Sequence, residues 1–442
     1  MGEQFLEITE KREVDAIIAR VAAEVVTARA QTEEASVEKV NVAEALGRVA
    51  AADVFSALNV PPFDRALMDG YAVVASDTFY ADEDNPASLI VTGLIFAGEL
   101  PSQSVEPGYC SGISTGAPLP KGADATVKVE NTAEYTEVIE GEERTRVKIY
   151  KPVAPGENIM RAGSDIKRGE QLIRSGTTLT PRDTGVLAAC GLNEVMVRRK
   201  PMVALMSTGN ELTAPGETLE PAKIYDVNTR ALSDSVRECG CTPYFLGIAR
   251  DTIEELSGKL REPLEKGVDV IIASGGTSAG VGDLLPKVVE ERGEILVHGV
   301  DIKPGKPFIF GSIHETPFFG LPGNPTSALV TFNLFVAPLL RVLSGLSRDY
   351  EDAKRRAGKG IKAKAAMRIF SDKGRNEYVL VTLTPAEKAE DAAFLAYPIL
   401  TGSGAITTLS KADGYLFMEK GKEIIEEGEP VDVVLLTELP RS

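Results

Sequence analysis

The chain has 442 residues, a formal net charge of −17 and a sequence pI of about 4.9. Such an acidic protein is a poor binder of nucleic acid or of an anionic membrane surface, although a few lysines can still make one cleft attract an anion. Hydrophobic residues make up 43% and charged residues 26%, which is ordinary for a soluble globular protein. The length is sufficient for several domains, each with its own core.

The rarer residue types exclude several other classes. The four cysteines form no CxxC pair, so we expect buried thiols in a reducing compartment. The two histidines, His298 and His314, fit no metal-binding spacing. The first residues have no basic start or apolar core of a signal peptide, and no apolar run of about 18 residues predicts a membrane span. We therefore expect a cytoplasmic protein.

In the first half of the chain, the residue composition and the predicted secondary structure change near Asp53. Apolar residues at helical spacing predict an amphipathic helix over residues 8–30. Residues 56–150 are rich in proline and glycine, and short apolar runs predict strands at 88–92, 109–113, 125–129 and 145–149. This part of the chain is predicted to be a β-rich domain.

The second half begins with a regular alternation. Between residues 185 and 345, buried strands at 202–207, 243–248, 268–273, 308–310 and 318–321 are separated by helical stretches, and a long helix is predicted over 325–343. This pattern predicts a doubly wound parallel sheet, in which ligands bind at the carboxyl ends of the strands. The last 97 residues or so return to short strands, predicted at 365–369, 378–384 and 431–436, and favour a small β-barrel.

A glycine-rich loop follows the strand at 268–273. Ser274, Gly275, Gly276, Thr277 and Ser278 stand between this strand and a helix, so backbone N–H groups and a helix N-terminus can bind an anion. The loop is neither a Walker A loop nor a GxGxxG fingerprint. Asp283 follows the glycines and either caps the next helix or holds a divalent metal.

Other strand ends carry similar chemistry. Lys303 and Lys306 flank a rigid Pro-Gly turn in Ile302-Lys-Pro-Gly-Lys-Pro307, which suggests a clamp for an oxyanion or phosphate. Asp226 is a helix cap or a metal ligand, and the residues leave both open. Two further strand ends are candidates for phosphate binding. One carries Thr208 and Gly209, and the other is a turn that opens a helix and contains Pro322, Gly323, Asn324 and Pro325.

Eight motifs in order resemble the molybdopterin molybdenumtransferase family, which includes MoeA and the gephyrin E domain. They are Met68-Asp-Gly-Tyr-Ala72, Thr115-Gly-Ala-Pro118, Arg161-Ala-Gly-Ser-Asp-Ile166, Ser207-Thr-Gly-Asn-Glu211, Tyr225-Asp-Val-Asn228, Ser274-Gly-Gly-Thr-Ser-Ala-Gly280 with Asp283, Ile302–Pro307 and Leu321-Pro-Gly-Asn-Pro325. The likeness extends from about residue 40 to the end of the chain.

The resemblance implies a fold of four parts. These are a split helical domain (residues 1–53 and 151–184), an inserted β-rich domain (54–150), an α/β molybdopterin-binding domain (185–345) similar to molybdopterin adenylyltransferases, and a C-terminal β-barrel (346–442). It also implies an elongated homodimer whose site is shared between subunits, and an upstream partner that is a molybdopterin adenylyltransferase.

The resemblance implies an enzyme that inserts molybdate, or tungstate, into adenylylated molybdopterin with release of AMP. Asp226 and Asp283 would hold Mg²⁺, and the oxyanion would be bound by Lys303, Lys306, Arg375 and Ser403. Asp69 and Thr115 would face the glycine loop of a partner. Asp165 and Glu194 match acidic positions of the family.

One position departs from the family. Many members carry a lysine four residues before Lys303, where this chain has Gly299. No Ser–His or Cys–His nucleophile is evident, so we expect catalysis by positioning and electrostatics. Two alternatives remain open at this stage: an adenylyltransferase-like activity with ATP, and a non-catalytic scaffold.

Overall fold

The computed structural model describes residues 8–31, 36–139, 142–277, 284–371, 374–386, 393–402 and 404–436, and its chain divides into two compact units. The first unit contains residues up to Lys39, Gly47–Ala51 and everything from Met196 onward; the second contains Val40–Leu46 and Ala52–Val195.

The second unit contains a six-stranded sheet. Its order is β7 (Ala125–Lys128), β4 (Gly70–Val73), β6 (Tyr109–Ile113), β5 (Ala87–Ile95), β9 (Glu142–Ile149) and β8 (Thr132–Ile139), and only β5 and β6 pair in parallel. Two short ribbons join β2 (Val54–Phe55) to β11 (Gln171–Ile173) and β3 (Arg65–Ala66) to β10 (Ile159–Met160). Its regular helices are η1 (Val42–Glu44), η2 (Ala75–Thr78), η3 (Val129–Asn131) and α3 (Pro181–Ala189). All four strand ranges expected between residues 56 and 150 fall on observed strands.

The first unit is built on a mixed six-stranded sheet. Its order is β16 (Thr242–Ala249), β13 (Met202–Thr208), β17 (Val270–Ser274), β21 (Thr316–Leu321), β20 (Ile309–Ile313) and β18 (Gly293–His298). The first four strands are parallel, as expected, but β20 runs antiparallel to both of its neighbours. The expectation of an all-parallel sheet is therefore wrong for the β18–β20 side, where a tight turn at His314-Glu315, both with positive φ, joins β20 directly to β21.

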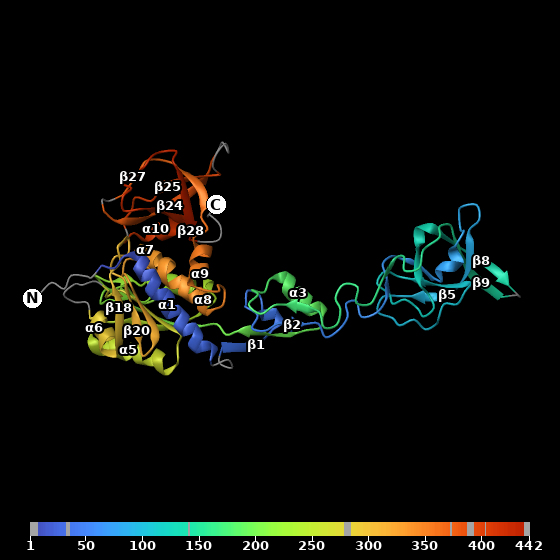
Figure 1. Cartoon of the computed structure of the whole chain (residues 1–442), viewed down its shortest axis with the longest axis horizontal. Coiled ribbons are helices and arrows are strands. Elements are labelled where there is room, and N and C mark those ends of the chain that lie inside the picture. Colours follow the sequence, from blue (N-terminus) through green and yellow to red (C-terminus); the bar gives the residue numbers. More distant parts are fainter. Residues whose placement is uncertain are drawn as a thin grey trace, which may run out of the picture. The chain divides into compact units, whose positions relative to one another are not determined.

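Alternate residues of these strands point to opposite faces and make two cores. Val203, Leu205 and Ile272 pack against α1 (Lys11–Ala30), α4 (Asn228–Glu238) and the helices after β21, whereas Ala204 and Ile271 pack against α5 (Ile253–Glu265) and α6 (Leu285–Arg292). Figure 1 shows α1 lying beside α8 across the sheet. The α/β alternation in the sequence thus gives a sheet covered on both faces.

The expected long helix over 325–343 is present as three continuous segments. They are α7 (Pro325–Thr331), the π-helical η4 (Phe332–Val336) and α8 (Ala337–Leu343). By length and composition this stretch could cross a membrane, with a mean hydropathy of 1.6, but 83% of its apolar window is buried in the fold. That burial is typical of the core helix of a soluble protein.

The chain ends in a closed five-stranded barrel (red in Figure 1), reached through α9 (Tyr350–Ala357). The strands are β24 (Asn376–Pro385), β25 (Phe394–Pro398), β22 (Ile361–Ala365), β28 (Pro430–Leu435) and β26 (Gly414–Met418), and β26 pairs back onto β24. The strand expected at 365–369 is displaced, because β22 ends at Ala365 and the short β23 begins at Ile369. A sixth strand, β19 (Ile302–Lys303), pairs with β24 and ties the barrel to the α/β part.

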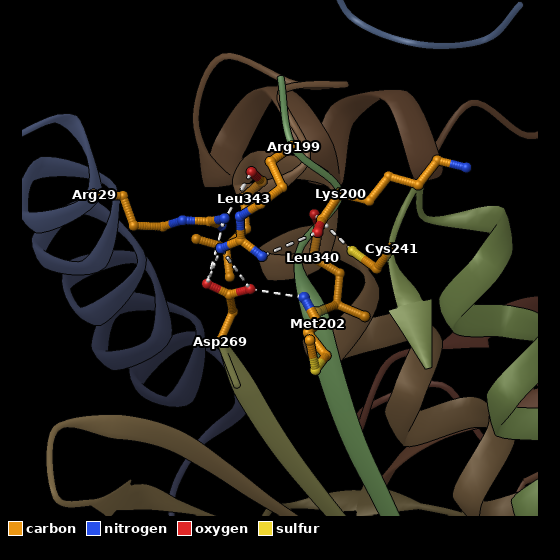
Figure 2. Close-up of polar contacts among 8 residues, drawn as sticks. All are labelled: Arg29, Arg199, Lys200, Met202, Cys241, Asp269, Leu340 and Leu343. Atoms are coloured by element: carbon orange, nitrogen blue, oxygen red, sulfur yellow. Dashed lines mark hydrogen bonds and ion pairs between the residues drawn. The ribbon is translucent and has the colours of Figure 1, made fainter. Parts of the chain in front are cut away.

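A charged cluster fixes the edge of the sheet at which β13 and β17 begin (Figure 2). The Asp269 carboxylate accepts a 2.7 Å hydrogen bond from the Met202 N–H and forms ion pairs with Arg29 at 3.3 Å and Arg199 at 3.4 Å. Burial lowers the pKa of Arg29, and the Asp269 carboxylate opposes that shift. Cys241 lies in the same cluster and donates to the Leu340 carbonyl at 3.7 Å. The cluster joins the first helix, the strand starts and the end of α8.

Candidate functional site

A cavity of about 1420 Å³ lies within the first unit, where β13, β17 and β21 end. Its walls come from the loops after these strands and from the turn around Lys303 and Lys306. The barrel contributes residues 367–370, 375, 377–380, 398–402, 404, 406 and 408. Parallel α/β sheets place ligands at this edge because the strand ends and helix starts present free backbone groups there. The strand-end residues expected from the sequence, as far as they are described, all line this one cavity: Thr208, Gly209, Asp226, Ser274, Gly275, Gly276, Thr277, Lys303, Lys306, Pro322, Gly323, Asn324, Pro325 and Arg375.

The glycines after β17 are required by close backbone contact. Gly275 has φ +101°, and a Cβ there would stand 2.4 Å from the Thr208 carbonyl oxygen. Gly276 has φ +64°, and its Cβ would stand 2.9 Å from the Thr208 hydroxyl. Only glycine lets the end of β17 lie this close to the end of β13.

Two hydroxyls at this cavity have no hydrogen-bond partner among the described residues. Thr208 Oγ1 and Thr326 Oγ1 are both buried, on side chains whose residues are 4% and 3% exposed. A buried hydroxyl without a partner costs about 1–3 kcal/mol, so it is rare in a fold unless a ligand completes it. Thr326 was not among the residues expected from the sequence. It directly follows the Leu321–Pro325 motif, and this position at the start of a helix could have indicated a ligand-binding hydroxyl.

Asn228 joins two of the cavity loops. Its Nδ2 donates to Ser274 Oγ at 2.8 Å and to the Gly323 carbonyl at 2.7 Å. Ser274 Oγ in turn donates to the Pro322 carbonyl at 3.3 Å. No role for Asn228 was expected from the sequence. In the structure, its two hydrogen bonds hold the glycine loop against the turn that opens α7.

Asp226 is buried, lines the cavity and bonds to the first turn of α4. Its Oδ1 accepts from Ser207 Oγ at 3.0 Å and from the Thr229 N–H at 3.2 Å, and its Oδ2 accepts from Thr229 Oγ1 at 2.6 Å. Asp226 therefore holds the first turn of α4 against the end of β13. An ionised carboxylate has about four lone-pair sites, so one remains on Oδ2.

The residues present fit Mg²⁺ only as an ion shared with a substrate. Within the described ranges, no group of three His, Cys, Asp or Glu residues lies close enough to hold a metal. Mg²⁺ is commonly held by one or two carboxylates together with substrate phosphates and water. Asp226 can supply one such ligand. Asp283, the second expected ligand, lies outside the described residues, as do Ser278 and Ser403.

The two expected oxyanion lysines differ in their surroundings. Lys303 Nζ forms a 3.1 Å ion pair with Glu377 of the barrel. Lys306 has no ion pair within the described ranges, and its half-buried side chain faces the cavity. Gly305 between them has φ +120°, and a Cβ there would stand 2.5 Å from Thr331 Cγ2, so the turn is closely packed on α7. Arg375 is exposed on the barrel side.

The second unit holds the remaining expected residues. Asp69 Oδ1 accepts from the Thr115 N–H at 2.7 Å and from Thr115 Oγ1 at 2.9 Å, and these two bonds, the N–H first, lower the pKa of Asp69. Gly70 next to it has φ +154°, and a Cβ would collide with the Val127 carbonyl oxygen at 1.9 Å. Thus a fixed, ionised carboxylate stands on a constrained turn.

Asp165 and Glu194 are not joined to that pair. Asp165 is exposed, its backbone N–H donates to the Val60 carbonyl at 3.1 Å, and no hydrogen bond connects it to Asp69 among the described residues. Glu194 is exposed at the start of β12 (Glu194–Arg198). The structure therefore gives each of these two acidic side chains a separate place in the fold.

Family profiles match the chain in three consecutive parts. Residues 12–191 match the MoeA N-terminal region (domain I and II), residues 204–342 match the "Probable molybdopterin binding domain", and residues 362–436 match the MoeA C-terminal region (domain IV). The cavity loops all fall within the second and third matches.

Whole-length relatives agree with these matches. The molybdopterin molybdenumtransferases of Nostoc sp. strain PCC 7120 and of Bacillus subtilis strain 168 are each 32% identical to this chain over 403 residues, covering 90% and 91% of it and 88% and 90% of their own lengths. A solved molybdopterin biosynthesis MoeA protein from Pyrococcus horikoshii is 39% identical, covers 98% of this chain with 100% of its own, and superimposes with a TM-score of 0.77. Identity at this level over nine-tenths of the length, with all three profiles in order, means that the chain belongs to the MoeA family.

Proposed function

We propose that this protein is a molybdopterin molybdenumtransferase that acts in molybdenum cofactor biosynthesis. Its reaction would insert molybdate, or tungstate, into adenylylated molybdopterin and release AMP. The observation that carries the proposal is the single cavity in which two unpaired buried hydroxyls, a glycine loop and two lysines meet at the strand ends. These groups suit a ligand with phosphates and a second, separate anion.

The phosphates of the substrate would bind at the glycine loop. The backbone N–H of Gly276 and the hydroxyls of Thr208 and Thr326 can donate to phosphate oxygens, whereas the Gly275 N–H is already bonded to the Leu321 carbonyl at 3.0 Å. Asn228 keeps the loops in register. Apolar side chains on the cavity wall suit the flat pterin ring: Leu219, Ile224, Tyr225, Met367, Phe370 and Leu400.

The oxyanion would bind between Lys306, Lys303 and Arg375. Their positive charges offset repulsion between molybdate and the substrate phosphates, which must approach each other for the reaction. Ser403 completes the set in the proposal. Gly299 supplies no charge here, so the clamp would have one lysine fewer than in many family members.

Asp226 and Asp283 would hold Mg²⁺ together with phosphate oxygens. The ion, when bound, would polarise the phosphoanhydride as AMP leaves. Asp226 brings one lone pair for this purpose while its other three hold α4 and the end of β13 in place.

We further propose that the site is completed by a second copy of the chain, with Asp69 and Thr115 of one subunit facing the glycine loop of the other. The family implies such a homodimer, and the ionised, exposed Asp69 is suited to an approaching polar surface. The four-domain division, a cytoplasmic location, roles for Asp165 and Glu194, and delivery of substrate by a molybdopterin adenylyltransferase belong to the same proposal. Mixing Asp69→Ala chains with Asp226→Ala chains should restore part of the activity in mixed dimers, and no restoration would contradict a shared site.

The deciding experiment is AMP release from adenylylated molybdopterin with Mg²⁺, in the presence and absence of molybdate or tungstate. Oxyanion-dependent release is expected. If the protein instead transfers AMP from ATP to molybdopterin and releases pyrophosphate, an adenylyltransferase is indicated. Substrate that stays bound and intact under every oxyanion would indicate a scaffold.

A further inference from the structure

Lys303 already has an anionic partner inside the cavity. Its Nζ lies 3.1 Å from Glu377 Oε1, and the Glu377 side chain is only 13% exposed. Ser371 Oγ donates to the other carboxylate oxygen, Oε2, at 2.8 Å. Other carboxylates also line the cavity, but among the described residues Glu377 is the one paired with a lysine of the proposed oxyanion turn, where it repels the ligand that the lysine attracts.

The backbone fixes this pair in place. Lys303 and Glu377 are direct register partners where β19 pairs in parallel with β24, and Asn376 donates from Nδ2 to the Asp301 carbonyl at 3.4 Å. Arg375 stands two residues before Glu377, so one barrel segment brings both a cation and an anion to the cavity. The backbone pairing of β19 with β24 therefore keeps Lys303 and Glu377 next to each other.

The pair has a direct consequence for anion binding. While Lys303 is held by Glu377, its charge is largely neutralised, and an entering oxyanion meets its main attraction from Lys306 and Arg375. The Lys303 ammonium has three N–H donors, so an entering oxyanion either shares it with Glu377 or draws it away, while Ser371 keeps the carboxylate in place. The binding equilibrium is thus a competition between two anions for one ammonium group.

We propose that Glu377 is a positioning residue that competes with the tetrahedral oxyanion for Lys303 and so sets the affinity of the cavity for that anion. This rests on the proposed function, because it takes the Lys303–Lys306 turn to be the oxyanion site. The carboxylate keeps Lys303 ordered at the cavity wall and lowers the occupancy of the site by a free oxyanion.

Isothermal titration calorimetry with sodium molybdate at constant ionic strength tests the proposal on the full-length protein. Glu377→Gln keeps the shape of the side chain and removes its charge, and it should bind molybdate about tenfold more tightly than the wild type. In a Lys303→Gln background the same change should raise the molybdate affinity by less than about threefold, since the ammonium group for which the two anions compete is absent there. Asp432→Asn removes an equal charge from an exposed barrel ion pair that does not line the cavity, and its affinity should match the wild type.

The outcomes separate this proposal from the function on which it rests. Equal or weaker binding by Glu377→Gln, including no heat at millimolar molybdate, overturns the role of Glu377, provided that circular dichroism and the thermal midpoint show a folded protein. An equal gain in both Lys303 backgrounds also overturns it, because general charge repulsion would then explain the gain. If Lys306→Met binds molybdate as well as the wild type, it is the oxyanion site itself that is misplaced.

Discussion

Strands β13 and β17 begin among paired charges and end beside unpaired hydroxyls. At their amino ends the Asp269 carboxylate has three polar partners, from Arg29, Arg199 and the Met202 N–H. At their carboxyl ends Thr208 and, across the cavity, Thr326 have hydroxyls with no partner among the described residues. At the amino ends of these two strands the buried polar groups around Asp269 have partners, whereas at the carboxyl ends two buried hydroxyls lack a partner among the described residues.

The difference separates stability from binding within one sheet. A satisfied buried network holds helices and strand starts together, whereas an unsatisfied hydroxyl weakens the free protein and favours the bound one. We therefore expect substitutions at the first edge to change unfolding and substitutions at the second to change ligand binding.

Removing Asp269 should have the largest effect on folding. Asp269→Ala leaves two partly buried guanidinium groups and the Met202 N–H without their acceptor, and we expect a loss of about 3 kcal/mol in the free energy of unfolding. Urea denaturation followed by circular dichroism measures it. Asp432→Ala, which breaks an exposed ion pair with Lys362, should cost less than about 0.5 kcal/mol. A similar small loss for both variants would mean that the Asp269 cluster does not stabilise the sheet.

Removing the charge of Lys306 should affect activity instead. Lys306→Met is expected to lower kcat/KM for oxyanion-dependent AMP release roughly thirtyfold, about 2 kcal/mol, with little change in the thermal midpoint. The matched control is Lys420→Met, whose lysine pairs with Asp301 at 3.2 Å outside the cavity lining and should leave kcat/KM unchanged. If Lys306→Met lost stability and kept its activity, the division between the two edges would be wrong.

A smaller effect is expected from the unpaired hydroxyl itself. Thr208→Val keeps the side-chain volume and removes the unpaired hydroxyl, so it should raise the free energy of unfolding by about 1 kcal/mol and weaken substrate binding about tenfold. The neighbouring Ser207→Ala removes a hydroxyl that does have partners, Asp226 and Thr229, and should cost about 1 kcal/mol of stability. Equal stability losses in the two variants would show that Thr208 has a protein partner.

The sequence could predict the strand-end loops because their signal is local. A buried strand followed by glycines, or by a proline that opens a helix, indicates its own position at the carboxyl edge of a parallel sheet. Four parallel strands, the 325–343 helix and a C-terminal barrel followed from the same local patterns. Asp226 was left open between cap and metal ligand because both roles require the same carboxylate.

The remaining features depend on contacts between segments far apart in the chain. Glu377 meets Lys303 only because β19 pairs with β24, and no local pattern gives that pairing. The same holds for Asp269, which meets Arg29 from a helix some 240 residues earlier. The strand at 308–310 was expected, but the antiparallel direction of β20 was missed because a short apolar strand has the same alternation in either direction.

The smallest effect is expected from a thiol at the stable edge. Cys239 ends α4 just before β16 begins, and burial, as the main cause, raises the pKa of its thiol from 9.0 to about 11. The folded protein therefore keeps this proton at a pH where the unfolded chain loses it, so the contribution of the neutral thiol is full below pH 9 and is lost as the pH rises toward 11. Cys239→Ala should lose about 1 kcal/mol at pH 7 from the smaller side chain, and its midpoint in urea should fall less than that of the wild type between pH 8 and pH 10. Burial also raises the pKa of other thiols and of tyrosines, but these groups are present in both proteins, so the difference between the two curves isolates the Cys239 thiol. Parallel curves would show that Cys239 is not held protonated by the fold, and the amino edge would then be less completely closed to solvent than its charge cluster indicates.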